Sequence, residues 1–298
     1  MSQTSMPQTP MPQIYSTLIQ LQELRPHLEE PGWAVVDCRF SLTETEAGRR
    51  AYQAGHIPGA VYAHLDQDLS GPILPGRTSR HPLPDAAEFA QRLSAWGIGP
   101  ETQVVAYDDR GGAIAARLWW MLRWLGYDRV AVLDGGWTAW RAAGYPVREG
   151  VEQRPPALFA PRPRPGLLVQ AEEVLARLGA QDLLLVDSRA PERYRGEVEP
   201  LDPVAGHIPG AVNRPFAQNL TPDQRFRSRE ELRARFQDLL DQRAPEQVAF
   251  YCGSGVTAAH NVLAMVHAGL GFPRLYAGSW SEWITDPARP VARSGMTE

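Results

Sequence analysis

A cysteine opens a short glycine-rich loop near the end of the chain. Residues 252–257 are Cys-Gly-Ser-Gly-Val-Thr, and the apolar run at 248–251 predicts a buried strand before them. Small and apolar residues at helical spacing follow. The glycines let successive N–H groups point into one concavity, to which the next helix adds its dipole. Because such donors stabilise a thiolate, we expect a lowered pKa and a nucleophilic sulfur at Cys252 that needs no metal and no adjacent histidine.

Two other interpretations of this loop compete with nucleophilic chemistry. A lone cysteine is often only a small buried residue, although the strand before it and the helix after it favour chemistry here. A tyrosine-phosphatase-like loop also begins with cysteine, but it needs an arginine at the position of Ala258 to bind phosphate. Phosphatase activity is therefore not expected. Thr257 has two interpretations of equal weight, a helix cap and a catalytic side chain.

Composition describes an ordinary soluble protein of about two domains. The chain has 298 residues, of which 43% are hydrophobic and 21% charged, with a net charge of −4. This charge gives no sign of nucleic-acid or membrane binding, and no run approaches the roughly 20 apolar residues of a membrane span. The only cysteines, Cys38 and Cys252, provide neither a disulfide framework nor a four-ligand metal site. We expect a cytoplasmic protein without metal or cofactor.

The chain repeats itself. Residues 18–28 line up with 168–178, and the segment Gly-His-Ile-Pro-Gly-Ala-Val occurs unchanged at 55–61 and 206–212. A long-period duplication indicates two copies of one domain and not a solenoid. The five prolines between the copies predict an extended linker. The expected organisation is a disordered tail at 1–13, an inactive domain at 14–148, a linker at 149–166, a catalytic domain at 167–290 and a C-terminal tail at 291–298.

Both copies predict the same α/β fold. Apolar strands alternate with helices, which indicates a parallel sheet flanked by helices on both faces. Ligands bind at the carboxyl ends of the strands in such sheets, and the Cys252 loop starts at one of these ends. In the first copy we expect helices at 18–28 and 86–96, a strand that ends at Asp37, and strands at 103–107 and 130–133. The corresponding elements of the second copy are helices at 168–178 and 229–240, a strand that ends at Asp187, and strands at 247–251 and 273–276.

The two copies differ at the residue that could do chemistry. Aligning Tyr107 with Tyr251 places Asp108 opposite Cys252. Since a carboxylate cannot replace a thiol nucleophile, we expect the second copy to be active and the first to form a wall of the site. Arg193 is a cation of the second copy alone, because Thr43 is its counterpart in the first.

The chain resembles the tandem-domain rhodanese family of sulfurtransferases. The resemblance rests on residues 186–189 (Val-Asp-Ser-Arg), Arg193, 206–210, 251–258 and 278–283. It implies that Cys252 accepts a sulfane sulfur as a persulfide and passes it to thioredoxin, a small thiol or cyanide. The N–H groups that would hold the persulfide belong to Gly253, Ser254, Gly255, Val256 and Thr257. A non-enzymatic persulfide carrier or sensor is the alternative.

The loop also bears on the sulfur donor. Thiosulfate enzymes of this family tend to have basic residues in the loop, whereas Gly253 and Ser254 resemble the 3-mercaptopyruvate branch, so thiosulfate is the second choice. Mercaptopyruvate has a single carboxylate, which the guanidinium of Arg193 could bind in a bidentate manner. Leu201 lies where that branch usually has a second arginine, and Arg195 is a candidate replacement.

The same resemblance suggests a proton relay. Ser254 and His81 match two of its members, and Asp68 is a weak candidate for the third. Other polar residues are expected to be structural. His56 and His207 occupy identical turns, of which one lies in the inactive copy, and Asp187 is expected to pair with Arg189. The remaining structural predictions are a packed His260, a quiet thiol at Cys38, and packing between lobes by Trp119, Trp120 and Trp124.

Overall fold

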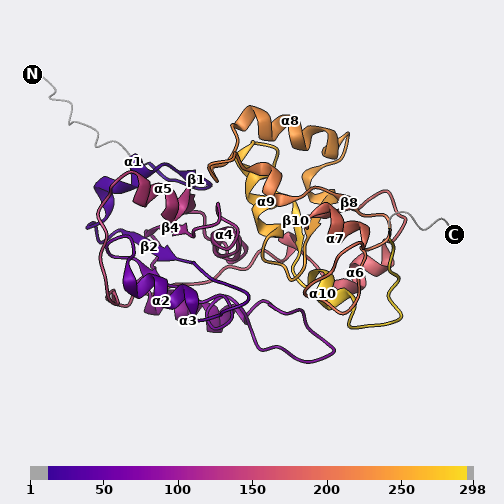
Figure 1. The fold of residues 1–298 in the computed structure, drawn as a ribbon, viewed down its shortest axis with the longest axis horizontal. Helices are drawn as coiled ribbons and strands as arrows, with labels where there is room; N and C mark the ends of the chain where they lie inside the picture. The colour runs from indigo at the N-terminus through magenta and orange to yellow at the C-terminus, as the bar shows by residue number, and fades with distance from the viewer. Residues whose placement is uncertain (1–12, 294–298) are drawn as a thin grey trace, which may run out of the picture.

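A computed structural model describes residues 13–293 of the chain. Figure 1 shows two lobes, the first built from the N-terminal half and the second from the C-terminal half. The predicted tails fall largely outside the described residues, although Ala292 still pairs with His207 of the second lobe. No helix within 13–293 is long and apolar enough to cross a membrane.

Each lobe contains one five-stranded sheet in which every neighbouring pair of strands is parallel. The strand orders are β1-β5-β4-β2-β3 and β6-β10-β9-β7-β8, so the two sheets have the same topology. The first lobe consists of β1 (Leu18–Ile19), α1 (Leu21–Leu24), η1 (Arg25–His27), β2 (Trp33–Asp37), α2 (Ala47–Ala54), β3 (Val61–Tyr62), α3 (Ala86–Ala95), β4 (Gln103–Tyr107), α4 (Ala115–Trp124), β5 (Val130–Leu133) and α5 (Gly136–Ala142). The second lobe consists of η2 (Pro165–Leu167), β6 (Leu168–Val169), α6 (Ala171–Ala176), β7 (Leu184–Asp187), α7 (Pro191–Arg195), β8 (Val212–Asn213), η3 (Phe216–Asn219), α8 (Arg229–Leu240), η4 (Pro245–Gln247), β9 (Val248–Tyr251), α9 (Ala258–His267), β10 (Arg274–Tyr276) and α10 (Ser279–Trp283).

The α/β prediction is confirmed, including the bounds of β4, β5 and α8. The helices expected at 18–28 and 168–178 are wrong at their start, because each copy begins with a two-residue edge strand. Gln20 is extended, with φ −84° and ψ 156°, and so separates β1 from α1. A strand of two residues is too short to show alternation, which is why the helical periodicity after it dominated the prediction.

The lobes meet along α4 and α9, which lie side by side at the centre of the molecule (Figure 1). Both helices are buried nearly all round, as expected for helices that cover their own sheet and also contact a second lobe. Trp119 of α4 stacks on Phe272 of the second lobe, with ring centroids 5.7 Å apart. The predicted packing between lobes is thus confirmed for Trp119, whereas the rings of Trp120 and Trp124 stack on one another.

We expect Trp119→Ala to lower the free energy of unfolding by about 3–5 kcal/mol, because a fully buried indole is removed. In urea unfolding of Trp119→Ala, Phe272→Ala and the double variant, the coupling energy should be about 0.5–1.5 kcal/mol. A control cycle pairs Trp119 with Phe236, whose ring packs on Phe250 instead, and should be additive. Equal coupling in the two cycles would contradict the assigned contact.

Candidate active site

The loop after β9 is held from outside by the start of α10. The carbonyl oxygen of Cys252 accepts a hydrogen bond from the N–H of Trp280 at 3.0 Å, and that of Gly253 accepts one from Ser281 at 2.9 Å. The N–H of Cys252 donates to the hydroxyl of Ser279 at 3.1 Å. Because these carbonyls are turned toward α10, the N–H groups that follow in the loop are free to face the thiol.

Two backbone positions make this arrangement sterically demanding. Gly255 has φ +80°, and a Cβ there would lie 2.0 Å from the carbonyl oxygen of Ala277, so only glycine fits. Ser279 has φ +56°, a left-handed conformation that is unusual outside glycine. Its counterpart in the first lobe is Gly136. The strain at Ser279 places its hydroxyl under the loop, between Cys252 N–H and the carbonyl oxygen of Tyr276.

The thiol of Cys252 is in an environment that favours its anion. Burial raises its pKa, but hydrogen bonds from the Thr257 hydroxyl and from the N–H groups of Ser254, Ala258 and Gly255 more than offset this effect, so the pKa lies below its usual value. Thr257 precedes α9 without capping it through its side chain, which answers the question that the sequence left open. Of the predicted N–H donors, those of Ser254 and Gly255 contribute to this effect, and Ala258, which was not predicted, adds a third.

The first lobe has the same ring of N–H groups around a different anion. The carboxylate of Asp108 accepts hydrogen bonds from the N–H groups of Arg110, Gly112, Ile114 and Ala115 at 2.7–2.9 Å. The loop geometry thus binds negative charge in both copies. In the first copy the protein's own carboxylate fills the ring, which explains physically why that copy has no place for a sulfur.

Residues of both lobes line a cavity of about 100 Å³ at Cys252. The first lobe contributes Leu42, Leu65, Arg80, His81 and Ile114, and the second contributes Arg193, Leu201, Cys252, Gly253, Ser254, Val256 and Thr257. Cys252 is only 2% exposed, and it faces this cavity. The predicted role of the inactive copy as a wall of the site agrees with this lining.

Three polar side chains connect the lobes beside the sulfur. Nδ1 of His81 lies 2.7 Å from the Ser254 hydroxyl, and its Nε2 lies 3.2 Å from the carboxylate of Asp66. Burial lowers the pKa of His81 despite this carboxylate, so its imidazole is neutral near pH 7. The carboxylate accepts the Nε2 proton, which leaves Nδ1 to accept the proton of Ser254. The three residues form a continuous hydrogen-bonded chain.

The third residue of this chain corrects a prediction. Asp68, the candidate from sequence, instead pairs with Arg92 and accepts the N–H of His64. The segment between β3 and α3 is irregular, so no periodicity indicated which of its two aspartates faces His81. Asp66 was therefore missed, although its position two residues before Asp68 was the available signal.

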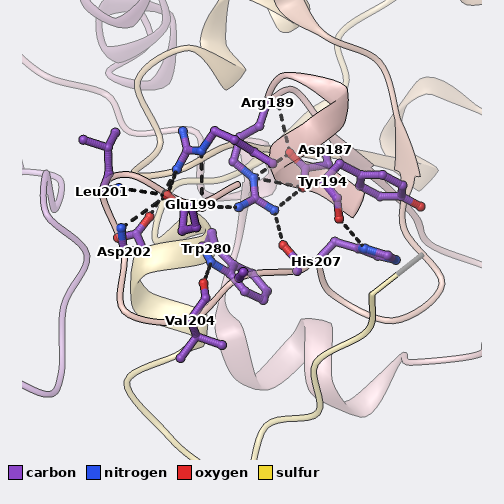
Figure 2. Close-up of polar contacts among 12 residues, drawn as sticks. Asp187, Arg189, Tyr194, Glu199, Leu201, Asp202, Val204, His207 and Trp280 are labelled. Carbon is purple, nitrogen blue, oxygen red and sulfur yellow. Dashed lines mark hydrogen bonds and ion pairs between the residues drawn. The ribbon is translucent and has the colours of Figure 1, made fainter. Parts of the chain in front are cut away.

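Arg193 is placed at the cavity by acidic residues of the following turn. Its Nη2 lies 2.6 Å from Glu199 and 3.4 Å from Asp202. Glu199 also accepts the N–H groups of Leu201 and Asp202, which closes the turn that Figure 2 shows. The idea that Arg195 replaces the missing arginine is wrong, because Arg195 is exposed and pairs with Glu197.

The strand-end pair is structural, as expected. Arg189 contacts Asp187 at 2.6 Å and donates to the carbonyl oxygen of Gly206 (Figure 2). Arg39 makes the same two contacts in the first lobe, to Asp37 and the carbonyl of Gly55. Since both copies have this arrangement, it belongs to the fold and not to the chemistry of one site.

Three further histidines and Cys38 also have structural surroundings. His56 and His207 each bond a backbone carbonyl of the preceding helix through Nδ1, to Tyr52 and Tyr194 respectively. His260 is fully buried, which lowers its pKa to about 4, and its Nε2 bonds the carbonyl of Gly111. Burial and nearby aspartates raise the pKa of Cys38 well above the usual value, so its thiol is unreactive.

One buried cation of the first lobe is hydrogen-bonded to the loop that begins at Cys252. Arg117 of α4 is fully buried, and its guanidinium donates to the carbonyl oxygens of Leu69, His81 and Gly255. No carboxylate of the described residues pairs with it, and burial lowers its pKa to about 10. Arg117 therefore fixes the relative position of the His81 segment and the loop around Cys252.

Within residues 13–293, no group of three or more His, Cys, Asp or Glu side chains could hold a metal ion.

The model of the rhodanese-like domain matches the chain twice, at residues 20–143 and 170–286. The chain belongs to the rhodanese family. Its two rhodanese-like domains correspond to the two lobes, and the duplication read from the sequence is thereby confirmed.

Several relatives of this chain have names that concern sulfur transfer. A probable 3-mercaptopyruvate sulfurtransferase of Pseudomonas aeruginosa is 53% identical over 276 residues, which cover 92% of this chain and 97% of the relative. A putative thiosulfate sulfurtransferase of Mycobacterium tuberculosis is 41% identical over 270 residues, 87% of this chain and 90% of its own. The solved 3-mercaptopyruvate sulfurtransferase of Leishmania major superposes with a TM-score of 0.79 at 35% identity, covering 90% of this chain and 74% of its own.

We expect Thr257→Val to raise the pKa of Cys252, because a hydrogen bond to a charged group, worth about 1.5–3 kcal/mol, is lost. The rate of alkylation by iodoacetamide, followed at Cys252 by mass spectrometry, reports the thiolate fraction. In wild type the rate should level off at a lower pH than for a free thiol, and the variant's midpoint should move upward. Thr138→Val, an exposed position on α5, is the control. An unchanged midpoint in Thr257→Val would contradict the donor role of its hydroxyl.

Proposed function

We propose that the protein is a sulfurtransferase that moves a sulfane sulfur from 3-mercaptopyruvate to a thiol or cyanide through a persulfide on Cys252. The observation that carries the proposal is the lowered pKa of a thiol that faces a small cavity and is ringed by N–H donors. Relatives named for this reaction and for thiosulfate sulfur transfer support the class. A reducing, cytoplasmic setting is part of the proposal, since both cysteines are free.

In the first half of the reaction, the Cys252 thiolate attacks the sulfur of 3-mercaptopyruvate. The carbon–sulfur bond breaks, and its electron pair stays on the organic fragment as the enolate of pyruvate. The proton lost by the donor thiol passes through the Ser254 hydroxyl to neutral His81 and returns to the enolate carbon. Arg193 binds the donor carboxylate, and the loop N–H groups hold the charge on the outer sulfur of the persulfide.

In the second half, an acceptor thiolate or cyanide attacks the outer sulfur. The sulfur–sulfur bond breaks and Cys252 leaves as a thiolate, which the same N–H groups stabilise. A pocket of about 630 Å³ adjoins the catalytic cavity, since Leu42, Ile114 and Thr257 line both. We propose this pocket as the approach of the acceptor, whether a small thiol, cyanide or the exposed cysteine of thioredoxin.

The charge at the cavity favours mercaptopyruvate over thiosulfate. The loop itself has no basic residue. Beside it, the guanidinium groups of Arg80 and Arg193 are balanced by the carboxylates of Glu199 and Asp202. A cluster with no net charge suits one carboxylate better than a dianion, which needs an excess of positive charge.

Cys252→Ser should abolish pyruvate release from 3-mercaptopyruvate, because no persulfide can form. Cys38→Ser is the matched control and should keep wild-type turnover. Steady-state pyruvate release by wild type, with a mass increase of one sulfur on Cys252 after the donor alone, would support the enzyme. Persulfide in stoichiometric amount without turnover would instead support a sulfur carrier.

We expect the kcat/KM for 3-mercaptopyruvate to exceed that for thiosulfate by at least about tenfold, which corresponds to about 1.4 kcal/mol at the transition state. Both donors are measured with one acceptor, cyanide, so that the second half-reaction is the same. A preference for thiosulfate of that size would show that the donor is wrong, while the persulfide route would stand.

A further inference from the structure

A second arginine reaches the catalytic cavity from the lobe that lacks a catalytic thiol. The guanidinium of Arg80 donates to both carboxylate oxygens of Asp202, from Nε at 2.9 Å and from Nη2 at 3.2 Å. The carboxylate is a fixed anchor, because the Asp202 side chain is only 2% exposed. The backbone N–H of Arg80 also donates to the Ser281 hydroxyl at 3.1 Å. Arg80 is thus held by the second lobe at both its backbone and its side chain.

The guanidinium groups of Arg80 and Arg193 converge above the residue that follows Cys252. A Cβ on Gly253 would lie 2.9 Å from Nη2 of Arg80 and 3.5 Å from Nη2 of Arg193. Both groups also contact Asp202 and line the same cavity as the thiol. Because Gly253 has no side chain, the two guanidinium groups can approach the loop this closely at the edge of the cavity that Cys252 also lines.

Each guanidinium keeps a donor for such an anion. Among the described residues, the hydrogen bonds of Arg80 to carboxylates use Nε and Nη2, and those of Arg193 use the same two nitrogens. Nη1 of each residue therefore has no acceptor within 13–293. Two adjacent guanidinium groups that each keep one donor suit the two oxygens of one carboxylate.

We propose that Arg80 binds the carboxylate of the sulfur donor together with Arg193, so that the inactive lobe supplies half of the donor's recognition site. Asp202 is then a positioning residue, since it holds Arg80 across the boundary between lobes. Leu201 has an apolar side chain, and Arg195 is paired on the surface, so neither can serve as a second cation beside Arg193. Arg80 can serve as that second cation. The inference rests on the proposed function, because it identifies the carboxylate donor of that reaction.

The test compares two alkylating agents of nearly equal size at Cys252. Iodoacetate has a carboxylate beside its reactive carbon, whereas iodoacetamide is neutral. Relative to wild type, Arg80→Gln should lower the ratio of the iodoacetate rate to the iodoacetamide rate by about tenfold, as expected for a lost hydrogen bond to a charged group. The iodoacetamide rate should stay within about twofold of wild type, since the thiolate is unchanged. Arg77→Gln, exposed in the same segment, should match wild type in both rates.

Two outcomes would overturn the proposal. An unchanged ratio in Arg80→Gln would show that Arg80 does not contact the anion, and an equal fall in both rates would show that it only holds the lobes together. If Arg80→Gln does not fold, Arg80→Lys gives the same test, because it keeps the charge but loses the planar fork and should lower the ratio less. Alkylation does not depend on turnover, so a wild-type enzyme that ignored 3-mercaptopyruvate would refute the proposed function without deciding this test.

With the donor itself, Arg80→Gln should raise KM for 3-mercaptopyruvate by about tenfold and change kcat less, because binding of the carboxylate is lost in both ground and transition state. Adding Leu201→Arg to Arg80→Gln should recover most of the KM, since a guanidinium would again lie beside Asp202. A rise in KM that Leu201→Arg leaves unchanged would contradict the role of Arg80 as a second carboxylate-binding group.

Discussion

The site depends on the direction in which a few peptide groups point. The start of α10 donates hydrogen bonds to the carbonyls of Cys252 and Gly253, so the N–H groups beyond them turn toward the sulfur. Gly255 is required for the same turn, because any side chain would strike the carbonyl of Ala277. Without these contacts only the Thr257 hydroxyl would oppose burial, which raises the pKa of the thiol. The anion at Cys252 is therefore a property of the loop backbone, to which Thr257 adds one side-chain donor.

The first lobe, which has no catalytic thiol, shows which features of the site belong to the fold itself. Its loop surrounds the carboxylate of Asp108 with four N–H groups, so the ring for an anion comes with the topology. In the second lobe, the corresponding N–H groups surround the thiol of Cys252 instead. The first lobe instead supplies side chains from outside: His81 to the polar chain, Arg117 to the loop carbonyl of Gly255, and Arg80 to Asp202. Both lobes thus contribute residues to a single site.

Much of this could be predicted from the sequence, and the failures have physical causes. Short apolar runs located β4 and β5 to the residue, the helical region read in the second copy gave the bounds of α8, and the internal alignment identified Cys252 against Asp108. Arg193 and His81 were found by resemblance and lie at the cavity. Asp66 and the cavity position of Arg80 were missed, because both lie in the irregular segment between β3 and α3. There the tertiary contacts to the second lobe, and not local spacing, decide which side chain faces inward.

A persulfide on Cys252 would be an anion that the backbone N–H groups of the loop can hold. The most direct measurement is a high-resolution crystal structure of the enzyme after reaction with 3-mercaptopyruvate and removal of the donor. We expect a second sulfur bonded to the Cys252 sulfur and within hydrogen-bonding distance of the N–H groups around it. An outer sulfur that points away from these groups, with the loop carbonyls turned inward, would contradict it.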